Sequence, residues 1–499
     1  WLPTDPAIPT AERPGHAEIR YHALGTDSKT DAVVHERLDN PEVFLGVDLS
    51  RDGRWLMAYV WHGWSASDIY IRDLQAENTS WTPFVVGIDA QFSVIAWEDH
   101  FYIITDEEAP KKRVLRAPAG HADRSTWTEI IPESADATLD DVSVLGGRLV
   151  LTTLRDAYSQ LVVHELDGTR VREVELPAIG AVYGVTGNPE DDTLYFSFNA
   201  MTIPYRIYTS SVRDGGSSVW AEVDVKVDPE PYQVEQVWYT SRDGTRVSMF
   251  ILRRRDAPRD GSTPFMLYGY GGFNVNMKPY FRASIYPWLE AGGGYALPNL
   301  RGGGEYGEAW HRDGMLTKKQ NVFDDFIAAA EYLIAEGYTA PERLAIRGGS
   351  NGGLLVGAAM TQRPELFGAV VCAAPLLDMV RYHLFGSGKT WISEYGSADD
   401  EEQFRALYAY SPYHNVKPGL DYPSMLMLSP EHDDRVDPLH ARKMVAALQT
   451  ADPGDAREPI LLRVERDAGH GGADLVRQHV ALEADVNAFL MRLFEMTPQ

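Results

Sequence analysis

A serine enclosed by glycines is the most specific chemical signal in this sequence. Ser350 lies in the run Gly348-Gly349-Ser350-Asn351-Gly352, which follows the apolar segment 343–347 and precedes a helix-like segment at 354–360. A tight turn between a strand and a helix lifts a serine hydroxyl above a sheet, and its close backbone contacts accept only glycine at the flanks. The N-terminus of the following helix stabilises negative charge. The pattern predicts that Ser350 is a nucleophile.

A serine hydroxyl attacks well only when a base takes its proton. In a strand–turn–helix architecture of this kind, an acid and then a histidine follow the serine along the chain. His470 lies in Ala468-Gly469-His470-Gly471, a loop that follows the apolar segment 460–464. A histidine in a glycine-rich loop after a late strand suits a base that reaches over the sheet. Four other histidines are expected to be surface or packing residues: His164, His414, His440 and His479.

The acid that orients the histidine is expected after the preceding strand, at 424–428. A carboxylate there fixes the tautomer of the imidazole and stabilises its protonated form. Glu431, Asp433 and Asp434 all follow this strand within a few residues. The spacing leaves the three carboxylates open.

The elements around these residues alternate between strand and helix from about residue 225 onward. A hairpin is predicted at 235–252, and apolar strands at 265–269 and 294–299. A helix is predicted at 321–336, with Asn321 as its cap and acidic residues at its positive end. Such alternation indicates a mainly parallel, doubly wound sheet with helices on both faces. Residues 225–499 are therefore expected to form an α/β-hydrolase domain.

Residues 1–224 follow a different pattern, with many short strands in a repeat. Four similar apolar segments start 46, 48 and 45 residues apart, and each follows a turn-like stretch. They are 55–60, 101–105, 149–154 and 194–198. A period of this length with several strands per unit is typical of β-propeller blades, and an irregular β-sandwich is the alternative.

The number of repeats predicts an incomplete ring. A partial unit at 19–24 precedes the four full ones. A propeller is stable because closing the ring leaves few open strand edges, and four and a half blades need not close. We therefore expect an N-terminal part of the ring to lie outside this chain.

Composition excludes several classes of function. The net charge is −26, which disfavours binding to the phosphate backbone of nucleic acids. No apolar stretch reaches the length of a membrane span. Cys372 is the only cysteine and lies in an apolar run, so an inert core thiol is expected and intrachain disulfides are excluded. A chain without disulfides fits the cytoplasm and is also compatible with the periplasm or secretion.

Five motifs together resemble the prolyl oligopeptidase family of serine peptidases, and most of all its bacterial prolyl endopeptidases. They are YGYGGF at 268–273, NLRGGGEYG at 299–307, GGSNGG at 348–353, HDDRV at 432–436 and AGHG at 468–471. The resemblance extends over essentially the whole chain and is most specific after about residue 230. It implies a seven-bladed propeller, only partly present here, coupled to an α/β-hydrolase domain.

The resemblance also implies roles for single residues. The acid falls on Asp433, the oxyanion hole on the Tyr270 hydroxyl and the Asn351 N–H, and a substrate carbonyl is bound by Arg435. A proline pocket maps onto Trp391, Phe273, Tyr395, Leu376 and Val436, together with Asn351. The implied activity is cleavage of short peptides after proline by a monomer, without cofactor or metal.

Three alternatives remain beside this hypothesis. An oligopeptidase that cuts after Arg or Lys needs acidic residues in its pocket, and Trp391 and Asn351 at the matching positions speak against it. A general esterase would use the same serine, acid and histidine. A non-catalytic scaffold or an inactive fragment is disfavoured by the intact set of Ser350, Asp433, His470 and Tyr270.

Overall fold

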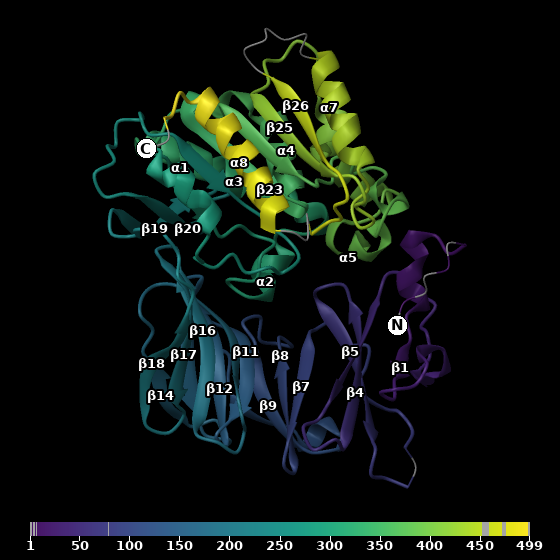
Figure 1. Ribbon diagram of the computed structural model, residues 1–499. Helices are drawn as coiled ribbons and strands as arrows, with labels where there is room; N and C mark the ends of the chain where they lie inside the picture. Colours follow the sequence, from purple (N-terminus) through teal and green to yellow (C-terminus); the bar gives the residue numbers. More distant parts are fainter. Residues whose placement is uncertain are drawn as a thin grey trace.

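The computed structural model describes residues 2, 5, 7–77, 79–451, 459–471 and 476–497. The chain forms two regions, one built of antiparallel sheets and one with helices packed around a larger sheet (Figure 1). The last strand of the first region ends at Glu222, and the first strand of the second begins at Tyr232. Among the described helices, none is both long and apolar enough to span a membrane.

The first region contains four four-stranded sheets, each made of consecutive antiparallel strands. The first two are β3 (Phe44–Leu49), β4 (Trp55–His62), β5 (Ala66–Asp73) and β6 (Thr82–Val85), then β7 (Phe92–Trp97), β8 (His100–Thr105), β9 (Arg113–Pro118) and β10 (Thr128–Ile131). The next two are β11 (Thr138–Leu145), β12 (Arg148–Arg155), β13 (Tyr158–His164) and β14 (Arg170–Val174), then β15 (Ala181–Gly187), β16 (Thr193–Ala200), β17 (Ile203–Ser211) and β18 (Gly215–Glu222).

These sheets are propeller blades that follow one another in chain order (Figure 1). The four similar segments of the sequence are the second strands β4, β8, β12 and β16, so the predicted repeat is confirmed. Apolar side chains fill the space between successive blades, for example Phe101 between the first and second blades and Leu149 between the second and third. Successive blades therefore bury their facing sides against each other.

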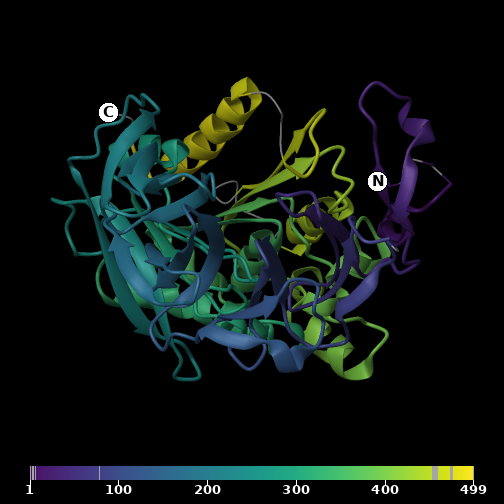
Figure 2. The same cartoon turned by 90° about the horizontal axis from the view of Figure 1, so that it is seen from below.

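The partial unit at the start of the chain is a two-stranded sheet. β1 (Ile19–Tyr21) pairs with β2 (Ala32–His35), and a 3-10 helix, η1 (Thr10–His16), precedes them. Figure 2 shows this purple segment at one edge of the molecule.

The second region is built on one eight-stranded sheet in the order β19-β20-β22-β21-β23-β24-β25-β26. The predicted hairpin is confirmed as β19 (Tyr232–Thr240) and β20 (Arg246–Arg254). The strands from β22 onward are parallel. They are β21 (Phe265–Tyr268), β22 (Gly294–Pro298), β23 (Leu344–Gly349), β24 (Ala369–Ala373), β25 (Ser424–Pro430) and β26 (Ile460–Glu465).

Helices cover both faces of this sheet, as an α/β-hydrolase requires. One apolar core contains side chains of α3, α4 and α7, and the other contains side chains of α1 and α8. Cys372 on β24 is buried and free, as expected. The helices are α1 (Tyr286–Glu290), α2 (Glu308–Arg312), α3 (Gln320–Ala335), α4 (Asn351–Gln362), α5 (Ile392–Tyr395), α6 (Glu401–Tyr410), α7 (Leu439–Ala451) and α8 (Val476–Leu493).

The predicted start of α3 is wrong in one detail. Asn321 does not cap the helix, because the chain enters it from the 3-10 helix η5 (Leu316–Lys318) and Lys319 is already helical. Asn321 lies inside the first turn and donates a hydrogen bond to the Asp313 carbonyl at 2.8 Å. Asp325, one of the acidic residues near the start of this helix, is buried and forms an internal ion pair with Arg301 at 2.6 Å.

Candidate active site

Ser350 lies at the sharp turn between β23 and α4. Its φ of 56° is in the left-handed region, which costs a non-glycine residue energy. The glycines are required by space: a Cβ on Gly348 would lie 2.1 Å from the Gly352 carbonyl oxygen, and one on Gly352 would lie 2.5 Å from that of Gly269. The Ser350 N–H donates to the Ala373 carbonyl at 2.8 Å, which holds the turn against β24.

The loops after β25 and β26 bring an acid and a histidine to this serine. His470 Nε2 lies 3.1 Å from Ser350 Oγ, and His470 Nδ1 lies 2.7 Å from Asp433 Oδ2. An ionised carboxylate only accepts hydrogen bonds, so Nδ1 carries the proton and Nε2 is free to accept from the serine. The three side chains can therefore pass the serine proton to the imidazole.

Burial separates the three carboxylates that the sequence left open. Glu431 and Asp434 are exposed, whereas Asp433 is buried. Asp433 Oδ1 accepts the N–H groups of Arg435 at 3.1 Å and Val436 at 2.8 Å. These donors hold the carboxylate in one orientation while its other oxygen faces His470.

Two further donors lie next to Ser350. Tyr270 follows β21; burial raises the pKa of its hydroxyl to about 12, against the nearby charge of Arg435 and a hydrogen bond with Ser350. Asn351 is the first residue of α4, so its N–H has no acceptor within the helix. The Tyr270 hydroxyl and the Asn351 N–H are thus placed to bind an oxyanion formed at Ser350.

The predicted pocket residues gather in one apolar cluster beside these donors. Phe273 packs against this cluster, and its ring lies edge-on to Tyr395 with centroids 5.3 Å apart. Arg435, the predicted ligand of a substrate carbonyl, is exposed and lies near Tyr270. The fully or nearly buried members are Leu376, Trp391, Tyr395 and Val436.

The propeller contributes to the site as well. Trp64, in the turn between β4 and β5, packs edge-on against Phe273 with ring centroids 4.5 Å apart. A cavity of about 820 Å³ lies between the two domains and is lined by both rings. Trp64 was not predicted from the sequence, where the only indication was an aromatic residue in the turn between two blade strands.

A second omission is a set of buried charged side chains next to Phe273. Glu394, Lys319 and His311 are almost completely buried, and Glu394 contacts each of the other two. They come from α5, the start of α3 and α2 respectively. None stands in a motif that carries chemistry by itself, so the sequence offered no signal for them.

Comparison with known proteins covers both regions of the chain. Residues 1–223 match the family model described as "Prolyl oligopeptidase, N-terminal beta-propeller domain", and residues 279–497 match the model of the "Prolyl oligopeptidase family". A prolyl endopeptidase of Elizabethkingia meningoseptica is 39% identical over 481 residues, which are 96% of this chain and 67% of that protein.

Solved structures agree with these matches. A structure from a study of two prolyl endopeptidases and their inter-domain dynamics has a TM-score of 0.97 and 55% identity; the match covers 100% of this chain and 73% of the other. Prolyl oligopeptidase B from Galerina marginata, bound to a hydrolysis and macrocyclization substrate, has a TM-score of 0.92 and 30% identity, over 97% and 69% of the two chains.

Proposed function

The chain belongs to the prolyl oligopeptidase family, and we propose that it is a serine endopeptidase that cleaves short peptides on the carboxyl side of proline. One observation carries the proposal: Ser350, His470 and Asp433 are linked by contacts of 3.1 and 2.7 Å next to a pocket of buried aromatic rings. One chain supplies all these residues, and we propose a monomer as the active form.

The reaction begins when His470 takes the proton of Ser350 as the hydroxyl oxygen attacks the prolyl carbonyl. Asp433 stabilises the imidazolium that forms. The oxyanion of the tetrahedral intermediate is bound by the Tyr270 hydroxyl and the Asn351 N–H. His470 then gives the proton to the leaving amine, and water activated by the same imidazole hydrolyses the acyl-enzyme.

Selectivity for proline follows from the shape and charge of the pocket. A flat, rigid pyrrolidine ring stacks well on the indole of Trp391, beside the edge-to-face pair of Phe273 and Tyr395. The carboxylate beside these rings, Glu394, already accepts hydrogen bonds from His311 and from the Phe273 N–H. It is therefore not free to bind the cationic side chain of an Arg or Lys substrate.

Chromogenic peptides that carry Pro or Arg before the leaving group test the proposal directly. We expect the Pro peptide to have the higher kcat/KM and the Ser350→Ala variant to be inactive on both. Faster turnover of the Arg peptide would refute the specificity. Covalent labelling by a fluorophosphonate should occur in the wild type and disappear in Ser350→Ala; labelling that persists in the variant would refute the nucleophile.

A further inference from the structure

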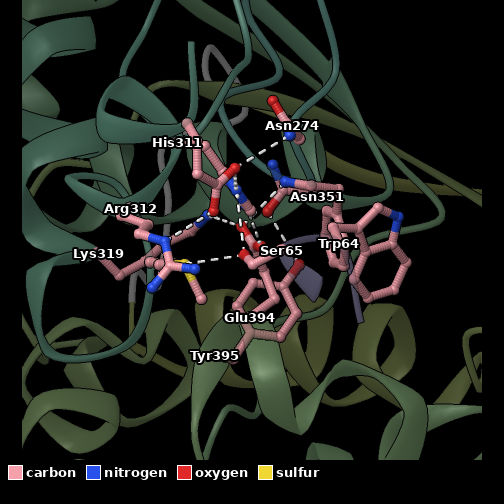
Figure 3. A network of polar contacts seen from close by, with 12 residues as sticks. Trp64, Ser65, Asn274, His311, Arg312, Lys319, Asn351, Glu394 and Tyr395 are labelled. Atoms are coloured by element: carbon pink, nitrogen blue, oxygen red, sulfur yellow. Dashed lines mark hydrogen bonds and ion pairs between the residues drawn. The ribbon is translucent and has the colours of Figure 1, made fainter. Parts of the chain in front are cut away.

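A buried ionic cluster lies close to Asn351, whose N–H is one of the two oxyanion donors (Figure 3). Its centre is the carboxylate of Glu394 on α5. Glu394 Oε1 accepts the Phe273 N–H at 2.9 Å and lies 3.4 Å from Lys319 Nζ. Glu394 Oε2 lies 2.8 Å from His311 Nε2. The side chains of Glu394 and Lys319 are each 1% exposed and that of His311 is 0% exposed, so water does not compete for these contacts.

The cluster holds the backbone that follows Tyr270. Lys319 Nζ donates to the Gly271 carbonyl at 3.0 Å, and Glu394 accepts the N–H two residues further on. Phe273 has a φ of 59°, in the left-handed region that a bulky residue avoids. Such a conformation persists only where surrounding contacts enforce it. The two hydrogen bonds from the cluster enforce it here.

The residue after Glu394 holds the other oxyanion donor. The Tyr395 hydroxyl donates to Asn351 Oδ1 at 2.8 Å, and Asn351 Nδ2 donates to the Tyr270 carbonyl at 2.5 Å. Consecutive residues of α5 therefore fix both ends of the oxyanion site. The contacts form a closed circuit from Glu394 through segment 271–273 to Tyr270, Asn351 and back to Tyr395.

We infer that Glu394 is a positioning residue, whose buried carboxylate holds segment 271–273 so that the Tyr270 hydroxyl faces the oxyanion. The inference rests on the proposed function and deepens it. Glu394 does not touch the reacting atoms and acts through Tyr270. Pre-oriented donors are valuable because they need no reorganisation as charge develops, and a shift of about 1 Å in such a group can cost about 100-fold in rate.

The charges of the cluster are consistent with an ionised Glu394. Burial alone would raise the pKa of this carboxyl, but Lys319 and His311 outweigh it and hold the pKa below its usual value. Burial would likewise lower the pKa of His311, but hydrogen bonds to Glu308 and Glu394 raise it to about 9. A neutral glutamine in place of Glu394 would leave these cations without their shared partner.

The test is a double-mutant cycle between Glu394 and Tyr270, read on the proline peptide. We expect Glu394→Gln to lower kcat by about 10- to 100-fold, with KM within about threefold, because the loss is confined to the transition state. In the Tyr270→Phe background the same change should alter kcat by less than about twofold, since the group that Glu394 positions is already gone. Glu483→Gln is the matched control, because it also removes a buried ion pair, the one with Arg347 (2.6 Å). Glu483 lies on α8, which packs on the opposite face of the sheet.

Two outcomes of this cycle would overturn the inference. Equal losses in the two backgrounds would mean that Glu394 does not act through Tyr270. A raised KM with unchanged kcat would assign Glu394 to the proline pocket. If Glu394→Gln does not fold, His311→Gln keeps a neutral donor to the carboxylate and is read in the same cycle, with the same criteria. A wild type that fails on the proline peptide while still reacting with fluorophosphonate would refute the proposed function instead.

Discussion

The two sides of Ser350 are built in different ways. On one side, His470 lies in a loop, is partly exposed, and is held by the buried carboxylate of Asp433 at 2.7 Å. On the other side, the segment after Tyr270 is held by Lys319 and Glu394, and α5 reaches across to Asn351 as well. On the base side, Asp433 orients His470, and on the oxyanion side a closed set of hydrogen bonds holds the two donors.

The difference matches what each group must do. A general base gains and loses a proton in every cycle and must meet the leaving amine and then water, so one orienting carboxylate and partial access to solvent suit it. Oxyanion donors must keep their positions while charge appears, because their value lies in avoided reorganisation. Redundant buried contacts provide this rigidity.

The largest expected effect breaks the base side at the contact between Asp433 and His470. Asp433→Asn should lower kcat by about 10⁴-fold, because the amide favours the wrong tautomer of His470 while leaving its position intact. Steady-state kinetics on the proline peptide measure the loss. The exposed neighbour provides the control, and Asp434→Asn should stay within about twofold of the wild type. Similar losses in both variants would mean that burial does not identify the acid.

The next effect concerns one donor on the oxyanion side. Tyr270→Phe removes the hydroxyl and keeps the ring, so kcat should fall by about 10²–10³-fold with little change in KM. Tyr268→Phe, two residues earlier at the end of β21, is the matched control and should keep nearly full activity. An unchanged kcat in Tyr270→Phe would mean that this hydroxyl does not bind the oxyanion, and that the contacts around segment 271–273 do not serve catalysis.

A smaller effect tests whether the propeller supports the oxyanion side. Arg312 pairs with Asp89 of the propeller through two contacts of 2.8 Å and with Glu308, which in turn contacts His311. Asp89→Asn should lower kcat by less than about threefold, since exposed ion pairs contribute only about 0.2–1 kcal/mol.

The Asp89→Asn effect should shrink at high salt, where the wild-type pair is already screened. Glu401→Gln removes an exposed pair with Arg405 on α6 and should change kcat at neither salt concentration. A salt-independent loss in Asp89→Asn would show that the ion pair is not the link.

The smallest effect is a dependence of stability on pH that arises in the cluster. The pKa of His311 is about 9 in the folded chain, and Glu308 and Glu394 face it, with Arg312 and Lys319 beyond them. Because this value exceeds the ordinary value of 6.5, the protonated imidazole stabilises the fold fully below pH 6.5, and this contribution is lost as the pH rises through 9.

Urea unfolding between pH 6 and 9.5 measures the effect. The midpoint should fall with rising pH in the wild type and fall less in His311→Gln, which does not titrate. Parallel curves for the two proteins would show that His311 is not protonated in the folded state.

Much of the fold followed from local pattern. The repeat marked the second strand of each blade, and the glycines around Ser350 marked the turn between β23 and α4. The cap of α3 was wrong because Asn321 has the right residue type, yet the chain before it was already helical. Residue type states a preference, and the preceding backbone decides whether the preference is used.

The sequence by itself determined the elements and the order of nucleophile, acid and base, because strand periodicity and the glycine turn depend on neighbours along the chain. Spacing along the chain left Asp433 and Asp434 open, and the family resemblance implied Asp433. The tertiary structure places Asp433 against His470, since burial depends on the packing of the whole loop. It alone joined His311 to Glu394, 83 residues apart, because contacts between distant elements exist only after the sheet and its helices have packed.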